Sequence, residues 1–234
     1  MTTLLLRLAG PLQSWGVDSK YTRRMAGTEP SKSGVVGMLA AARGIDRADE
    51  LPEDLLQLRF GVRSDQPGTV IRDFQTAVHE NGTSMPLSER YYLSDAMFLA
   101  VIESDTATLE ALRDSLMRPR FALYLGRRAC PPVQPLVQGI VEHDLVEALT
   151  QTPWLVPQDQ RRLAQFKDVS SLAVARDLVS GEDPADGDRV RDEPETFDPH
   201  RRRHGWRAVK RYRVSPPGLE PESLPEHEPQ PFGD

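Results

Sequence analysis

Cysteine is almost absent from the 234-residue sequence, which contains only Cys130. A single cysteine excludes an intramolecular disulfide and is typical of proteins from reducing compartments. No apolar run approaches the roughly 18 residues that a membrane-spanning helix requires. Met1 leads directly into strand-like residues, without the charged and apolar segments of a signal peptide. These absences predict a cytoplasmic protein without membrane association, long enough for one large domain or for a domain with an appendage.

Patterns typical of metal and cofactor sites are also missing. The five histidines, His79, His143, His200, His204 and His227, show no metal-binding spacing with cysteine or carboxylates. Cys130 precedes two prolines and has no paired histidine. We therefore expect neither a metal nor a cofactor. One catalytic alternative stays open, in which His79 or His204 acts as a general base for attack by an RNA 2′-hydroxyl, although a binding or surface role is favoured.

The formal net charge of -6 conceals a segregated distribution. Three runs are poor in acids: Arg7 to Arg43 has six cations and two acids, Arg118 to Arg128 has four cations, and His200 to Arg213 has seven. If folding brings these runs together, they form a basic track on an acidic body, which suits one polyanionic partner. Separate solvated faces are the alternative.

The hydrophobic pattern predicts an α+β fold. Strands are expected at residues 3–8, 58–63, 70–78, 90–102 and 136–141, and helices at 31–44 and 106–117. Ser31 or Ser33 is a suitable N-cap of the first helix and Gly44 a suitable end. The order is interpreted as strand, helix, strand, strand, helix and a further strand at 136–141, which is the β-α-β-β-α-β order of a ferredoxin-like domain.

The amino-acid composition changes after Thr150, and this change predicts a division of the chain. We expect a ferredoxin-like domain at 1–150 and a small C-terminal β extension at 151–214. Within the extension, Glu182 to Pro199 is acidic and proline-rich and is predicted to be a loop, whereas GWRAVKRYRV alternates like a strand at a sheet edge. Residues 215–234 are rich in proline and acids and are predicted to be disordered.

The start of the first helix is a candidate phosphate site. The segment SKSG offers free backbone N–H groups, hydroxyls and Lys32 at a helix N-terminus, beside Ser33. The spacing of a Walker loop is absent. Gly34 and Gly37 each cost roughly 1 kcal/mol in a helix interior; close packing of the helix against the sheet explains them equally well.

Two loops supply further candidates. Arg127 and Arg128 follow a glycine and precede prolines, so they are expected to be exposed and able to reach a phosphate or a base. In the loop after the first strand, Trp15 can stack on an unpaired base while Gln13 reads its edge; a buried tryptophan that anchors the loop is the alternative. The same loop adds Gly16, Arg23 and Arg24 as candidates.

Four sequence blocks together resemble the CasD family, the subtype I-E branch of the RAMP-type subunits that cap the 5′ end of CRISPR RNA in the Cascade complex. The blocks are LLLRLAGPLQSWG, PSKSGVVGMLAAARGI, RDFQT followed by YYLSDAMF, and RPRFALYLGRRACPPVQPL. They stand in the right order and cover most of the chain up to about Val214. The acidic tail is not part of the pattern.

The resemblance implies a ferredoxin-like body that grips the repeat-derived 5′ handle of the RNA. It also implies a protruding β-hairpin thumb, at about residues 72–95, that packs against the neighbouring backbone subunit and helps to kink the guide. Carried over by position, the handle contacts are Gln13, Trp15, Lys32, Ser33, Arg127 and Arg128. The corresponding thumb residues are Arg72 and Gln75.

The basic run at 200–213 is expected to contact nucleic acid or a neighbouring subunit, with the large subunit and target DNA as candidates. Its candidate residues are Arg203, His204, Arg207, Lys210 and Arg211. A sister branch of the family cuts precursor RNA with tyrosine, lysine and histidine, but no Lys-His pair is evident here. The sequence therefore predicts a non-catalytic RNA-binding subunit for antiviral defence; a metal-independent endoribonuclease and a purely scaffolding subunit are the alternatives.

Overall fold

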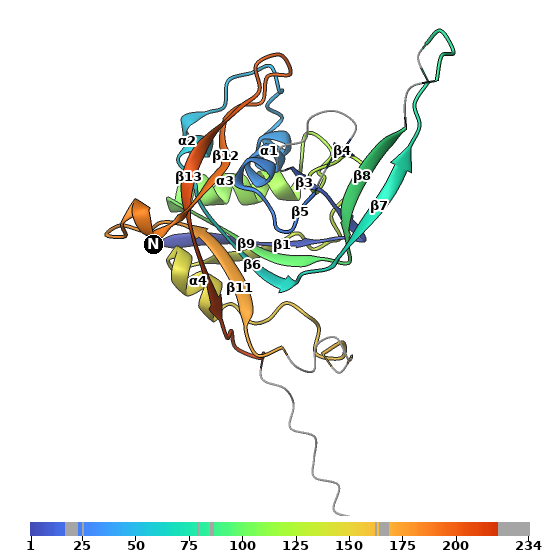
Figure 1. The fold of residues 1–234 in the computed structure, drawn as a ribbon. Helices are drawn as coiled ribbons and strands as arrows, with labels where there is room; N and C mark the ends of the chain where they lie inside the picture. Colours follow the sequence, from blue (N-terminus) through green and yellow to red (C-terminus); the bar gives the residue numbers. More distant parts are fainter. Residues whose placement is uncertain are drawn as a thin grey trace, which may run out of the picture.

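A seven-stranded antiparallel sheet forms the body of the protein in the computed structural model (Figure 1). The structure describes residues 1–16, 23, 24, 26–78, 80–84, 87–161, 163 and 169–219. The strand order is β10 (Val137–Val141), β1 (Thr2–Ala9), β9 (Met97–Ser104), β6 (Arg59–Gln66), β11 (Leu172–Asp177), β13 (Arg203–Val214) and β12 (Asp188–Thr196).

The central strands are apolar on both faces because helices cover both sides of the sheet. In β9, Phe98, Ala100 and Ile102 join the core beneath α1 (Lys32–Arg43) and α3 (Thr106–Met117). The alternate residues Leu99 and Val101 pack with α4 (Leu145–Gln151) in a second cluster. This alternation follows from the two-residue period of a strand. Figure 1 accordingly shows α4 on the opposite side of the sheet from α1 and α3.

The predicted helices begin and end close to the predicted residues. Ser31 caps α1 by accepting from the Gly34 backbone N–H, and Gly44 ends it in the left-handed region at φ 83°. Asp105 caps α3, whose buried residues are Leu109, Leu112 and Leu116. The sequence analysis missed two short helices, α2 (Glu53–Leu56) and α4. Asp144 and Glu147 form a capping box at the start of α4.

A long hairpin rises from the body beside this sheet (Figure 1). It consists of β7 (Thr69–Gln75) and β8 (Ser88–Ser94), which pair from Thr69 opposite Ser94 to Gln75 opposite Ser88. The predicted single strand at 90–102 is therefore two strands, β8 and β9, separated at Asp95, which has a positive φ of 57°. At its base the hairpin pairs with β2 (Leu12–Gln13) and β4 (Arg23–Arg24).

The strands after residue 150 continue the sheet of the first part of the chain. β11 pairs with β6, and β13 lies between β11 and β12, as the strand-like pattern of GWRAVKRYRV predicts. The prediction of a loop from Glu182 to Pro199 is wrong, because Asp188–Thr196 forms the edge strand β12. Its acids and Pro194 are tolerated at an edge, where one side of the strand needs no partner. The domain division at residue 150 stays a prediction.

The start of the acidic tail packs on the body. Leu219 is buried with Trp154, and the backbone N–H of Trp154 donates to the Pro217 carbonyl at 3.1 Å. Residues 220–234, the rest of the segment predicted to be disordered, lie outside the described residues.

Arg63 on β6 joins the sheet to the end of α4. It is fully buried, and its Nε and Nη2 atoms donate to the two carboxylate oxygens of Asp65 at 2.6 and 2.9 Å. Its remaining bonds go to the carbonyls of Leu149, Thr152 and Pro153. A planar guanidinium satisfies all of these acceptors at once, which a lysine ammonium cannot do.

We expect Arg63→Ala to lower the free energy of unfolding by about 3–5 kcal/mol, because it leaves the buried Asp65 carboxylate without its cation. Urea denaturation of the purified chain measures this change. Arg113→Ala is the matched control, since the exposed pair of Arg113 with Asp114 contributes only about 0–1 kcal/mol. Equal stability of the two variants would contradict the assigned role of Arg63.

Candidate nucleic-acid interface

The loop after β1 is an internal anchor in this structure. Gln13 and Trp15 are both fully buried. The Gln13 amide nitrogen donates to the carbonyls of Leu8 and Ala96, and its amide oxygen accepts from the Trp15 indole N–H at 2.9 Å. The prediction that Trp15 stacks on a base is therefore wrong for this conformation, and the anchoring alternative describes it. Gly16, in β3 (Trp15–Gly16), is exposed.

Trp15 also explains the glycine at the start of α1. A Cβ atom on Gly34 would lie 2.9 Å from the indole Cε3 atom of Trp15 and 3.0 Å from the Ser31 hydroxyl. Gly34 therefore permits the close approach of α1 to the anchored loop, and its helix-propensity cost is a packing requirement. This favours the packing interpretation of Gly34 over the phosphate interpretation.

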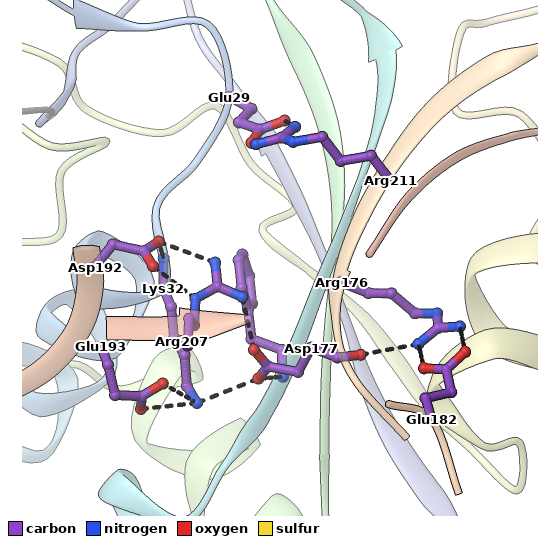
Figure 2. Close-up of polar contacts among 10 residues, drawn as sticks. Glu29, Lys32, Arg176, Asp177, Glu182, Asp192, Glu193, Arg207 and Arg211 are labelled. Atoms are coloured by element: carbon purple, nitrogen blue, oxygen red, sulfur yellow. Dashed lines mark hydrogen bonds and ion pairs between the residues drawn. The ribbon is translucent and has the colours of Figure 1, made fainter. Parts of the chain in front are cut away.

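The N-terminus of α1 is already occupied by carboxylates of the chain itself. The Lys32 backbone N–H donates to Asp192 at 2.8 Å, where the helix dipole favours an anion. The Lys32 ammonium lies 2.8 Å from Glu193 and 3.2 Å from Asp177, and Figure 2 shows it between the two. Lys32 and Ser33 are buried. They do not form the open phosphate site that the sequence predicted.

Arg207 completes this ion cluster, which we define as Lys32, Asp177, Asp192, Glu193 and Arg207 (Figure 2). The Arg207 guanidinium donates to Asp177 at 2.6 Å and to both carboxylate oxygens of Asp192 at 2.6 and 3.0 Å. Burial lowers the pKa of Arg207, but Asp192 and Asp177 raise it further, so it lies above its usual value. Burial also raises the pKa of Glu193, against the effect of Lys32. Two cations and three carboxylates thus compensate one another internally.

Lys210 and Arg211 of the basic run also have acidic partners. Arg211 lies 2.6 Å from Glu29 and 3.1 Å from Asp188, and Lys210 lies 2.8 Å from Glu182. Arg176 binds Glu182 as well, and together Arg176 and Lys210 hold the pKa of Glu182 well below its usual value. The run at 200–213 is therefore not the uncompensated patch that its sequence indicates.

The remaining two candidates of that run lie near the tip of the β12–β13 ribbon. Arg203 is exposed, with Glu195 at 3.7 Å. His204 is half-buried, and its Nδ1 atom has no hydrogen-bond partner among the described residues. Burial and the nearby Arg202 guanidinium lower the pKa of His204 below its usual value. His79, the other candidate base, lies outside the described residues.

Arg127 and Arg128 do lie together at the surface, next to the base of the hairpin. The Arg127 guanidinium is 4.8 Å from the centre of the Tyr92 ring and donates to the Tyr91 carbonyl at 3.3 Å. Arg128 is exposed. Tyr91 and Tyr92 belong to β8, so Arg127 connects the loop to the hairpin. Arg128 is exposed, as the sequence predicts, whereas Arg127 is half-buried and its contact with β8 was not predicted.

The conformation of this loop is fixed by the anchored segment around Ser14. The Ser14 N–H donates to the Leu125 carbonyl at 3.0 Å. Gly126 has φ 86°, and a Cβ atom there would lie 1.8 Å from the Ser14 carbonyl oxygen. Only glycine fits this close approach. The Gln13–Trp15 anchor thus positions Arg127 and Arg128 instead of contacting a ligand itself.

The base of the hairpin contributes basic residues that the sequence analysis did not select. Arg90 on β8 stands opposite both Asp73 and Arg24, and its Nε atom is buried without a hydrogen-bond partner in the described part of the chain. Of the predicted thumb residues, Arg72 stacks on Phe74 at 4.7 Å, and Gln75 donates to Asp73. The side chains of Arg23 and Arg24 lie outside the described part. The pairing of β8 with β4 and β7, which the sequence pattern does not specify, places Arg90 opposite Arg24 and Asp73.

The described residues show neither a metal site nor a membrane-spanning helix. They contain no group of three or more histidine, cysteine or acidic side chains arranged to hold a metal ion. None of the helices in the described part is both long and apolar enough to cross a membrane.

We expect Arg207→Ala to lower the free energy of unfolding by about 3–5 kcal/mol, because it leaves Asp192 buried without its cation and Asp177 with Lys32 as its remaining cation. Chemical denaturation of the chain tests this expectation. Arg213→Ala on the same strand is the control, since Arg213 is exposed and binds Ser171 rather than a carboxylate. A loss no larger than that of the control would show that the ion cluster does not hold the ribbon.

Comparison with known proteins places the chain in a family. A family model described as "CRISPR-associated protein (Cas_Cas5)" matches residues 3–210. The Cascade subunit CasD of Escherichia coli K12 is 34% identical over 156 residues, which cover 58% of this chain and 70% of the relative.

Two solved structures resemble the whole body of the protein. One, described as a crystal structure of a Cas protein, is 38% identical with a TM-score of 0.69, covering 91% of this chain and 95% of that one. The other belongs to a CRISPR RNA-guided surveillance complex and is 30% identical with a TM-score of 0.72, covering 92% and 91%. With a family model spanning almost the entire described body, the chain belongs to the CRISPR-associated Cas5 family.

Proposed function

We propose that this chain is a non-catalytic subunit of a type I-E CRISPR surveillance complex and that it holds the 5′ handle of the CRISPR RNA. A relative that is a Cascade subunit and a similar chain in an RNA-guided complex support this role. The observation that carries the proposal is the pair Arg127 and Arg128, held at the surface where the loop meets the hairpin.

The geometry suits a short RNA strand. Tyr91 and Tyr92 tether the Arg127 guanidinium, which therefore loses little rotamer freedom when it binds a phosphate. Arg128 is exposed beside it and supplies a second cation. Arg90 adds positive charge at the adjacent hairpin base. Phosphate contacts of this kind provide affinity and position, whereas base contacts provide specificity.

The fold supports the same proposal. The strand order β10-β1-β9-β6, antiparallel throughout, with α1 and α3 on one face, supports a ferredoxin-like core. The β7–β8 hairpin takes the part of the thumb, and its exposed apolar side chains suit contact with a neighbouring backbone subunit. These side chains are Val70, Ile71, Phe74, Val78 and Leu87. The large subunit and target DNA are further proposed neighbours.

Replacing both arginines, Arg127→Ala with Arg128→Ala, is expected to weaken binding of a handle RNA oligonucleotide about tenfold or more. The slope of log affinity against log salt is expected to fall by about 1–2, because each lost phosphate contact removes about 0.7 of slope on a single strand. Fluorescence anisotropy across a salt titration of the full chain, alone and within the assembled complex, measures both quantities.

Arg113→Ala with Arg118→Ala is the control for net charge, since it also removes two cations. Arg113 lies on α3, and Arg118 is the C-cap residue of that helix. This variant is expected to keep most of the affinity. An unchanged salt slope in the Arg127 and Arg128 variant would remove this loop from the handle site. Circular dichroism checks that the loss of the Arg127 contact to Tyr91 has not unfolded the hairpin.

The absence of catalysis is a separate part of the proposal. We expect labelled repeat RNA to remain intact during incubation with the purified chain in chelator. Discrete cleavage that His204→Ala abolishes would instead establish the metal-independent endoribonuclease. Ultraviolet crosslinking in the assembled complex distinguishes handle binding from pure scaffolding, since only the former yields crosslinks between RNA and the Arg127–Arg128 loop.

A further inference from the structure

The β12–β13 ribbon at the edge of the sheet presents two chemically different faces (Figure 1). On β13, Arg207 and Val209 point toward α1, where they join the ion cluster and the core. Side chains alternate along a strand. Trp206, which precedes Arg207, and Ala208, which lies between Arg207 and Val209, therefore point to the opposite face. On β12, Val190 packs on the core, which places its neighbours Arg189 and Arg191 on the same outer face as Trp206.

Trp206 is the most conspicuous side chain of this outer face. It is 57% exposed, and the Arg189 guanidinium lies 5.0 Å from the centre of its ring. Arg191 is exposed and donates from Nε to the His204 carbonyl at 3.2 Å, across the strand pair. An exposed indole is thus bordered by two guanidinium groups that the strands hold in register.

The charge of this face differs from that of the rest of the ribbon. Arg203, Arg207, Lys210 and Arg211 each have a carboxylate within 4.0 Å. Within the described residues, Arg189 and Arg191 have none at that distance; their recorded contacts are the indole and a backbone carbonyl. Glu182, at the turn before β12, is already bound by Arg176 and Lys210. The two guanidinium groups therefore retain donors for an external anion.

The surroundings of Trp206 favour a nucleotide over a protein partner. Protein interfaces place such a tryptophan within a larger apolar patch that excludes water. On β12 and β13, Trp206 is the one exposed large hydrophobic side chain among the described residues. An isolated aromatic ring flanked by cations instead matches a base-stacking platform, in which the ring takes the base and the cations take the phosphates.

We propose that Trp206, Arg189 and Arg191 form a second binding site for unpaired nucleotides of single-stranded nucleic acid, apart from the Arg127–Arg128 loop. The indole stacks on a base, and the two guanidinium groups bind the flanking phosphates. The ion cluster on the opposite face holds the ribbon in place, so the platform is formed before the ligand arrives.

The chain offers a built-in probe for this site. Its three tryptophans are Trp15, Trp154 and Trp206, and the first two are buried. The fluorescence difference between the wild-type chain and Trp206→Phe therefore isolates the exposed indole. On titration with a 12-nucleotide oligouridylate at low salt, we expect the Trp206 emission to be quenched and its accessibility to iodide to fall.

Arg189→Ala with Arg191→Ala keeps the reporter and is expected to weaken this binding about tenfold, with a salt slope lower by about 1–1.5. Trp206→Ala, followed by anisotropy of labelled oligouridylate, is expected to weaken binding by a similar or larger factor. Arg201→Ala with Arg213→Ala is the control of equal charge, since both side chains are exposed outside this face. It should retain near wild-type affinity.

Three results would overturn the proposal. The first is Trp206 emission that oligouridylate does not quench, and the second is an equal loss of affinity in the charge control. The third is protection of Trp206 by polyglutamate as strong as by oligouridylate, because this result would identify an acidic protein surface as the partner. The Arg127 and Arg128 variant separates the two sites, since it should still show Trp206 quenching. Handle binding without any response of Trp206 would refute this site and leave the handle site intact.

Discussion

Arg207 binds carboxylates from two neighbouring strands at the point where the edge ribbon crosses the start of α1. Asp177 ends β11, accepts from the Phe60 N–H on β6 at 2.8 Å, and also binds Lys32 on α1. Asp192 accepts from Arg207 and from the α1 N-terminus. Removing either cation, Lys32 or Arg207, would leave buried carboxylates with too little positive charge to compensate them, which costs far more than the intact cluster contributes. The ribbon, the sheet and α1 are thereby fixed relative to one another by a single set of charges.

This constraint determines which cations remain available to a ligand. The chain has more acids than cations, and folding directs much of the C-terminal basic run to carboxylates of neighbouring strands. Among the described residues, cations at the surface without a carboxylate within 4.0 Å include Arg128 and, on the outer face of β12, Arg189 and Arg191. The affinity for a polyanion is expected to depend on cations of this kind rather than on the total number of basic residues.

The sequence predicted the framework well because strand alternation and helix caps are local properties. Ser31, Gly44 and the apolar stripe of Leu109, Leu112 and Leu116 identify the helices without any tertiary information. The acidic segment around Asp192 was wrongly predicted to be a loop, because a strand whose acids are matched by Lys32 and Arg207 cannot be recognised until the partners are known. The burial of Trp15 has the same origin, since its partner Gln13 and the space at Gly34 are set by packing.

The predictions of an open phosphate site at Lys32 and of an uncompensated basic run at Arg207 were wrong for one physical reason. Positive charge in a sequence indicates a binding surface only where folding does not supply an internal anion. The Lys32 ammonium lies 2.8 Å from Glu193, and the Arg207 guanidinium donates to Asp192 at 2.6 Å, so both charges are used to hold the fold. The Arg127 guanidinium lies 4.8 Å from the centre of the Tyr92 ring and donates to the Tyr91 carbonyl, and these contacts orient it at the base of the hairpin. Arg189 beside Trp206 shares that environment. Aromatic contact alone does not mark a binding cation, because Arg207 and Arg176, which are bound by carboxylates, also lie 5.6 and 5.4 Å from the Phe60 and Tyr212 rings.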